Sequence, residues 1–311
     1  MAELDSLYKA FRQIGEDPAQ ILTPQTAFVV AYGHEVVGLQ SVEGVILIPR
    51  RTGEGIELRA TVLEGRHIET PVHLCFGLFE RVGVQNVLLQ LTMQPDSRAT
   101  FWSHCLFTNV ENARHAMTAT VDIQAGAQLI YNEVHYHGVS GGIEVIPRAQ
   151  VAVGPRARYV ADFTLVQGRV GTLDIDYDVK VAEDGVAELT SKVYGHATDV
   201  IRIREAVSLD GDNARGLVKS RVALDDEATA EIVGATYGNA AGARGHVDCL
   251  EIVRGNAKAS AIPEVRVSHP QAKVTHEAAI GSVDQKQLEA LMARGLAPED
   301  AVDRIILGML G

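Results

Sequence analysis

Short apolar runs separated by turn residues fill the chain from Phe28 to about Ile280. Val45-Ile46-Leu47-Ile48 and Val87-Leu88-Leu89 are examples, and Gly, Asp and Asn stand between the runs. This pattern is typical of β-strands. No helical period of useful length interrupts it, which excludes a fold that alternates strands with helices, such as a Rossmann-type nucleotide domain. The region 26–281 is therefore predicted to be a mainly β core.

A loose internal repeat of 28 to 30 residues runs through the second half of this region. The pattern Val121-x-Ile123 recurs at Val151-x-Val153, and Val222-x-Leu224 resembles Leu250-x-Ile252, 28 residues on. Stacked parallel coils require such self-similarity, because each coil buries its inward face only against the next. The repeat predicts a β-helix, or β-solenoid. An antiparallel sandwich also gives short strands with turns between them and stays open on the pattern alone.

Helical periodicity marks the N-terminal segment, residues 1–25. Apolar residues recur at helical spacing over 3–14, and Gly15 provides a stop signal. A short amphipathic helix is expected there.

The C-terminal segment, residues 282–311, is predicted to form two helices. Ser282 and Gln285 have the spacing of a capping box, Gly295 ends the first helix, and Pro298 begins the second. Such a pair either closes the open end of the solenoid as a cap or offers its apolar stripe to a partner protein, and the two roles are compatible. The stripe consists of Leu288, Leu291, Val302, Ile305 and Ile306.

Composition narrows the choice of partners and compartment. The chain has 311 residues, of which 46% are apolar and 22% charged, and its net charge is -12. Without a Lys/Arg stripe, this charge repels nucleic acid and anionic membranes. The sequence shows no export signal and no membrane span, so a cytoplasmic address is expected. Three distant cysteines argue against a disulfide scaffold and a zinc knuckle.

The clearest candidate chemistry combines Cys249 with the run Thr275-His276-Glu277-Ala278. Cys249 and Glu277 are 28 residues apart, so we expect them on adjacent coils. Thiolate is the ligand that iron-sulfur clusters favour, and imidazole or carboxylate makes the site more labile. Since adjacent strand positions face opposite ways, only one of His276 and Glu277 can face Cys249, and the sequence leaves open which one. A lone strand cysteine is otherwise most often a small buried hydrophobe.

A second constellation consists of His104-Cys105, His115 and Glu133-x-His135-x-His137. Period-two spacing puts the last three side chains on one face of a strand, and Cys105 precedes Glu133 by 28 residues, about one coil. We expect a metal or sulfur-handling site, with Cys105, His135 and His137 as metal ligands. Solvated or paired histidines on a β face are the alternative.

Five C-terminal motifs together resemble the SufB/SufD family, the scaffold components of the SUF iron-sulfur cluster assembly machinery. The stretch from Pro71 to Tyr177 also resembles the compact members of that family. The resemblance implies a right-handed parallel β-helix with a C-terminal helical segment that docks on a SufC-type ABC ATPase. The motifs are Gly245-His-Val-Asp-Cys249, Ile252-Val-Arg-Gly-Asn-Ala257, Ile262-Pro-Glu-Val-Arg266, Val274-Thr-His-Glu-Ala-Ala279 and Arg294-Gly-Leu296.

By this resemblance the cluster-assembly cysteine falls on Cys249, and the family's His-Glu pair falls on His276 and Glu277, which is closer to SufB than to SufD. A labile iron-sulfur cluster is implied, with 4Fe-4S favoured over 2Fe-2S. The implied partners are a second copy in a homodimer or a SufB/SufD-like heterodimer, a sulfur donor and acceptor apoproteins. Thr275 stands where some SufB sequences have another acid, and the long SufB N-terminal extension is lacking, so a flavin is not expected.

The chain is expected to be an assembly scaffold and not an enzyme. It has no phosphate-binding loop, so ATP hydrolysis must come from the partner. One alternative is a carbohydrate-active enzyme on a β-solenoid, although aromatic content is only 5% and Trp102 is the single tryptophan. The other is a mononuclear metal-binding protein that uses His104, Cys105, His135 and His137.

Overall fold

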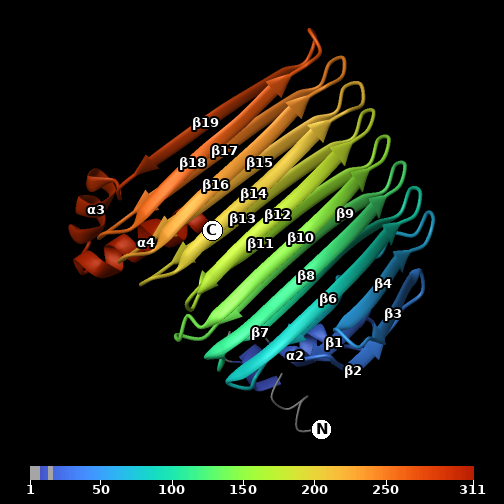
Figure 1. Cartoon of the computed structure of the whole chain (residues 1–311), viewed down its shortest axis with the longest axis horizontal. Coiled ribbons are helices and arrows are strands. Elements are labelled where there is room, and N and C mark those ends of the chain that lie inside the picture. Colours follow the sequence, from blue (N-terminus) through green and yellow to red (C-terminus); the bar gives the residue numbers. More distant parts are fainter. Residues whose placement is uncertain (1–7, 13–16) are drawn as a thin grey trace.

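The chain forms a β-solenoid of about eight turns (Figure 1). The structure is a computed structural model that describes residues 8–12 and 17–311. Each turn contributes one strand to a ten-stranded sheet and one to a nine-stranded sheet, and the two sheets enclose the core. The predicted β-solenoid is therefore confirmed, and the antiparallel sandwich is wrong for the body of the fold.

The ten-stranded sheet has the order β19-β17-β15-β13-β11-β9-β7-β5-β1-β2. Its strands are β1 (Phe28–Tyr32), β2 (Glu35–Gln40), β5 (Val72–Gly77), β7 (Arg98–Phe107), β9 (Gln128–His137), β11 (Arg158–Gln167), β13 (Val186–Gly195), β15 (Arg215–Leu224), β17 (Arg244–Val253) and β19 (Lys273–Gly281). All neighbours are parallel except β1 and β2, which pair antiparallel at the N-terminal end.

The nine-stranded sheet has the order β18-β16-β14-β12-β10-β8-β6-β4-β3. Its strands are β3 (Val45–Arg51), β4 (Ile56–Val62), β6 (Val82–Met93), β8 (Asn112–Ile123), β10 (Ile143–Val153), β12 (Thr172–Val181), β14 (Val200–Leu209), β16 (Thr229–Gly238) and β18 (Lys258–Val267). Here β3 and β4 form the antiparallel pair, and the remaining pairs are parallel.

Stacking of equivalent apolar positions holds the turns together. Val121, Val151, Val179 and Val207 lie in register on four successive strands of the nine-stranded sheet and are all buried. The predicted match between Val121 and Val151 is confirmed. Because inward and outward side chains alternate along each strand, such columns fill the lumen with apolar groups while polar groups face out.

The predicted match of Val222 with Leu250 is wrong by one residue. Val222 pairs with Glu251, and Leu250 pairs with Arg221, because this coil is 29 residues long. A slip of one residue moves every side chain to the opposite face of a strand. The correction therefore decides which residues of the last coils face the lumen.

One corner of each coil requires a left-handed backbone. At this corner one residue per coil has a positive φ angle, and these residues recur 28 to 30 positions apart. Asp, Asn and Gly adopt this conformation most readily, which explains most of the sequence at these corners. At Gly126 a Cβ atom would also lie 2.1 Å from Oδ1 of Asp96 in the coil below. The corner residues are Asp96, Gly126, Arg156, Asp184, Asn213 and Gly242.

Helices lie at both ends of the solenoid. Residues 8–12 are helical, and the rest of the helix predicted over 3–14 lies outside the described residues. Phe11 of this helix is fully buried and packs with Cys75 and Leu106 in a small cluster that is separate from the main core. The one-turn helix α2 (Pro18–Ile21) follows.

The C-terminal helices are α3 (Gln285–Met292) and α4 (Pro298–Leu310). The predicted capping box is wrong, because the side chain of Asp284, and not that of Ser282, accepts the capping hydrogen bond from the Gln287 amide. Helix α4 packs against the outer face of the ten-stranded sheet. There Val302, Ile306 and Leu310 contact Tyr194, Ala223 and Ile252. No helix in the described part of the chain is long and apolar enough to cross a membrane.

Candidate functional site

Cys249 lies inside the solenoid near its C-terminal end. It occupies an inward position of β17 and is 1% exposed. Its register neighbours are Ser220 on β15 and Ala278 on β19. Since β19 is the last strand of its sheet, a single strand separates Cys249 from the end of the solenoid.

Polar side chains gather around Cys249 in this part of the lumen. Ser191 donates a hydrogen bond to Glu205 (Oγ to Oε1, 2.7 Å), and Ser220 donates one to Glu251 (Oγ to Oε1, 3.2 Å). All four side chains are at most 2% exposed. Burial raises the pKa of each carboxyl group to about 7, against the effect of its serine partner. The group combines a thiol with two carboxyls that can gain or lose a proton near neutral pH.

The thiol of Cys249 is kept protonated in this environment. Burial raises its pKa, a hydrogen bond with Ser220 opposes this, and the charges of Glu251 and Glu205 raise the pKa further. A thiolate is the form that binds metal. Metal binding at Cys249 must therefore be coupled to loss of the thiol proton.

Gly234 packs closely against β17 beside the thiol. A Cβ atom built on Gly234 would lie 3.5 Å from Sγ of Cys249 and 2.6 Å from Cγ1 of Val247. Gly234 of β16 is in register with Glu205 of β14, so this close contact lies beside one of the buried carboxyls. Sequence reasoning missed Glu205, Glu251 and Gly234. Glu251 stands two residues after Cys249, and that period-two spacing is the signal that could have found it.

The register separates His276 from Glu277. His276 pairs with Val247 and Glu277 with Asp248. His276 therefore shares the lumen side with Cys249, while Glu277 faces outward. The expectation that Cys249 and Glu277 occupy equivalent positions 28 residues apart is wrong, because the coil has 29 residues. Thr275 also faces outward, where its hydroxyl lies 2.8 Å from Nδ1 of His246.

The C-terminal end of the solenoid is open. In the described chain, β18 and β19 each have a strand neighbour on only one side. His276 and Ala278 are exposed although they face the lumen side, and apolar side chains are exposed around them. The C-terminal helix α4 does not lie over this end, because it packs on the outer face of the sheet. These apolar residues are Ile262, Val265, Val267 and Ile280, with exposed fractions of 45%, 38%, 48% and 47%.

The second cluster lies in the lumen at β7, β8 and β9. Cys105 pairs in register with His135, and Ser103 with Glu133. Cys105, Glu133 and His135 each offer one ligand atom, and these three atoms lie within 4.8 Å of one another. His115 of β8 approaches from the other sheet, with Nε2 3.8 Å from Sγ of Cys105. All four side chains are at most 3% exposed.

Hydrogen bonds order the protons in this second cluster. His137 Nδ1 donates to the carbonyl oxygen of Arg169 (2.9 Å), so Nε2 of the neutral ring accepts from His135 Nδ1 (3.4 Å). His135 Nε2 is then an acceptor, 2.9 Å from Oε1 of Glu133. Glu133 must donate its carboxyl proton to this nitrogen. Burial raises the pKa of Glu133 to about 8 and lowers the pKa values of His135 and His137 to about 3, which fits this neutral chain.

The structure does not bring all the predicted members of this cluster together. His104 faces the opposite side of β7, where it stacks on Trp102 and lies against His73 and Phe11. His137 lies beside His135 and contacts Arg169, outside the group of three ligand atoms. Glu133, and not His137, is the third member of that group. Alternation along the strands places His104 away from Cys105.

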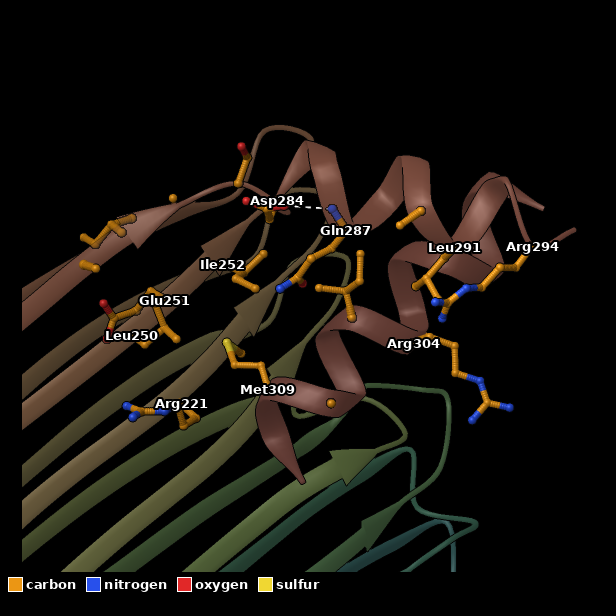
Figure 2. A pocket seen from close by; sticks show the side chains of 17 residues that line it. Arg221, Leu250, Glu251, Ile252, Asp284, Gln287, Leu291, Arg294, Arg304 and Met309 are labelled. Carbon is orange, nitrogen blue, oxygen red and sulfur yellow. Dashed lines mark hydrogen bonds between the residues drawn. The ribbon is translucent and has the colours of Figure 1, made fainter. Parts of the chain in front are cut away.

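A groove of about 850 Å³ lies where the C-terminal helices meet the strands, and residues of both line it (Figure 2). Leu250 and Ile252 line it from the strand side, and Leu291 and Met309 line it from the helices. Arg304 lies at its margin.

The predicted partner stripe is divided between two environments. Val302 (9% exposed) and Ile306 (1% exposed) are buried against the chain's own sheet. The prediction that they belong to an exposed stripe is therefore wrong. Leu291 and Ile305 line the groove, and Leu288 is partly buried.

Comparisons with known proteins agree with this architecture. A family model described as SUF system FeS cluster assembly, SufBD core domain, matches residues 80–309. The chain is 36% identical over 309 residues to an iron-sulfur cluster assembly SufBD family protein of Methanocaldococcus jannaschii, with 99% of this chain and 98% of the relative covered. A SufBD family protein of Pyrococcus horikoshii is 32% identical over 309 residues, with 99% and 94% covered. The chain belongs to the SufBD family of iron-sulfur cluster assembly proteins.

Proposed function

We propose that this chain is the scaffold on which a labile iron-sulfur cluster is built, with Cys249 as its thiolate ligand. The observation that carries the proposal is the position of Cys249, one strand from an open solenoid end and on the same side as His276. Iron-sulfur clusters are held by thiolates, and imidazole replaces thiolate in some of them. Family membership favours this function over a carbohydrate-active enzyme.

A second copy of the chain completes the site in this proposal. Unpaired strand edges and exposed apolar side chains meet at the open end, and such edges are normally covered. Two copies joined there supply two Cys249 thiolates and two His276 imidazoles. A homodimer therefore provides four ligands without a SufD-like partner. Glu277, on the outward side of β19, is an additional oxygen ligand only if the edge strand twists at the interface.

Lability follows from this ligand set. Two thiolates bind a cluster less firmly than four, so the cluster can pass to an acceptor apoprotein. We favour a 4Fe-4S over a 2Fe-2S cluster on the strength of the family resemblance. The carboxyl groups of Glu205 and Glu251 lie close enough to influence the thiol of Cys249, and they can accept its proton when iron binds.

A SufC-type ABC ATPase is the proposed source of ATP hydrolysis, and the helices α3 and α4 are its docking surface. Leu291 and Ile305 line the groove there, while Met292 and Leu307 are 41% and 47% exposed. Apolar side chains exposed on a helix pair suit a partner that lays a helix or loop into the groove.

Anaerobic reconstitution with iron, sulfide and reductant tests the scaffold proposal. The wild-type chain should bind iron and acid-labile sulfide and show cluster absorption, whereas Cys249→Ala should hold no acid-labile sulfide and show no cluster absorption. Cys75→Ala is the matched control, because Cys75 is buried in the separate N-terminal cluster. Full retention of iron and sulfide by Cys249→Ala, with an unchanged circular dichroism spectrum, contradicts the proposal.

A further inference from the structure

Cys105, Glu133 and His135 form a compact set of metal-binding side chains that cluster assembly at Cys249 does not use. They extend into the lumen from neighbouring strands, and their ligand atoms lie within 4.8 Å of one another. We propose that these three residues bind one divalent ion of the borderline class, Zn²⁺ or Fe²⁺, inside the solenoid.

The ligand types select this class of ion. Thiolate, imidazole and carboxylate together suit Zn²⁺ and Fe²⁺, whereas Mg²⁺ and Ca²⁺ prefer oxygen ligands alone. In a tetrahedral zinc site the ligand atoms are about 3.3–3.8 Å apart, as follows from bond lengths of about 2.0–2.3 Å. A shift of about 1 Å closes the present spacing, and side-chain rotation can supply it.

His135 is already oriented as a metal ligand. His137 accepts a hydrogen bond from Nδ1 of His135, and the carbonyl of Arg169 fixes His137 in turn. This leaves the lone pair of His135 Nε2 directed at Glu133, 2.9 Å away. Metal-bound histidines commonly have their second nitrogen held by such a partner, which fixes tautomer and ring orientation. A metal ion takes the place of the proton between His135 and Glu133.

The charges of the loaded site balance. A thiolate and a carboxylate carry two negative charges, and a divalent ion cancels them. This matters because an unpaired charge in a buried, apolar lumen is strongly unfavourable. All three side chains are at most 3% exposed, so neutralisation cannot come from solvent.

A fourth ligand is at hand. His115 Nε2 lies 3.8 Å from Sγ of Cys105, and its Nδ1 is buried without a hydrogen-bond partner among the described residues. A cavity of about 20 Å³ also adjoins Glu133. This is enough for one water molecule, which needs roughly 10–15 Å³. His115 Nε2 can therefore complete a four-ligand set by a small shift of its ring, while Nδ1 on the other side of the ring takes no part.

The same cavity offers a route from the surface. It is lined by Pro147 and by Arg148 and Asp162, whose side chains are partly exposed. In the ladder between β10 and β12, Val145 and Arg148 have partners on β12, but Pro147 between them has none. Proline has no amide proton for the ladder, and the pairing of β10 with β12 is therefore interrupted where the cavity lies.

The inferred metal site is separate from Cys249. Four strand spacings lie between β9 and β17 in the ten-stranded sheet, which corresponds to about 19 Å at about 4.8 Å per strand. No side chain is shared, so the inference stands whether or not Cys249 assembles a cluster.

Cobalt titration of the metal-free 311-residue chain tests the inference. Co²⁺ reports thiolate coordination by a sulfur-to-metal charge-transfer band and four-coordinate geometry by intense visible bands. The titration is done in the Cys249→Ala background, so that Cys249 contributes nothing. We expect one Co²⁺ per chain with both signatures. Cys105→Ala added to this background should abolish the charge-transfer band and weaken binding at least tenfold, whereas Cys75→Ala should change neither.

Glu133→Gln guards against a folding defect, because the amide keeps the size of the side chain and its hydrogen bond to His135. A tenfold weaker affinity with an unchanged circular dichroism spectrum supports the site. A charge-transfer band that survives Cys105→Ala overturns the inference, as does failure of the folded Cys249→Ala chain to bind Co²⁺. Elemental analysis of protein purified from cells distinguishes resident zinc from iron.

Discussion

At the scale of single residues, burial raises the pKa values of two carboxyl groups in the lumen to about 7. Glu205 and Glu251 each receive one hydrogen bond from a serine and lie near Cys249. A fully buried ionised carboxyl needs more compensation than one serine provides. The lumen around Cys249 therefore favours proton uptake as pH falls toward neutrality.

Stability should respond to this feature through Glu205. Its folded-state pKa is about 7, above the ordinary value of 4.5, so the folded chain holds the proton more tightly than the unfolded chain. The stabilising contribution is complete below pH 4.5 and is lost as pH rises through about 7. Glu205→Gln should raise the free energy of unfolding at pH 8.5 by about 2 kcal/mol and change it little near pH 5. Urea unfolding at both pH values measures this. An equal effect at both values contradicts it.

The close packing at Gly234 beside Cys249 is another single-residue feature. In Gly234→Ala the new methyl would stand 2.6 Å from Val247, so β16 or β17 must shift at a cost of about 1–3 kcal/mol. Thermal unfolding should show the loss. Gly53→Ala is the control, because a Cβ atom there meets nothing within 4 Å. If Gly234→Ala is as stable as Gly53→Ala, the lumen tolerates the methyl group.

At the scale of the element, helix α4 packs one face on the sheet and lines the groove with another. Ile306 is 1% exposed and packs on the sheet, whereas its neighbour Ile305 lines the groove. Adjacent helical positions point about 100° apart, so one helix can hold its own position and offer a surface to a partner.

Adjacent substitutions in α4 should therefore act differently. Ile306→Ala should destabilise the packing of α4 by about 2–4 kcal/mol, seen as faster hydrogen exchange in 298–310. Ile305→Asp should leave exchange unchanged and abolish copurification with the ABC ATPase. If Ile305→Asp retains the ATPase, docking lies elsewhere on the solenoid.

The open end shapes the behaviour of the whole molecule. The N-terminal end of the solenoid finishes in antiparallel pairs, β1 with β2 and β3 with β4 (Figure 1). The C-terminal end finishes in parallel edge strands with exposed apolar side chains. Since exposed edges promote pairing between chains, this end is where a dimer is expected.

Charges at that end should prevent dimer formation. Val265→Lys combined with Ile280→Lys places like charges where two copies meet, and light scattering should then report a monomer. Val139→Lys is the control, because Val139 is 89% exposed and lies far along the solenoid from β19. A dimer that survives the double substitution places the interface elsewhere.

Much of the architecture was predictable from the sequence. Alternating apolar positions and a repeat near 29 residues specify stacked parallel coils, since period and alternation are local properties of the chain. Phe28 begins the first strand and Pro298 begins the last helix, as predicted. The shared face of Glu133 and His135 was also visible as a period-two pattern, but Cys105 pairs in register with His135, 30 residues on, and not with Glu133 at 28.

Only the tertiary structure decided which side chains meet. The one-residue difference between a 28-residue and a 29-residue coil is not visible in a loose repeat. It puts His276, and not Glu277, on the side of Cys249 and brings Glu251 into the lumen beside it. The length of each coil depends on how its corners pack on the coil below, as at Gly126 and Asp96. Likewise, the burial of Val302 and Ile306 depends on where α4 meets the sheet. Register and docking arise from contacts between distant segments, and a local sequence pattern contains no record of those contacts.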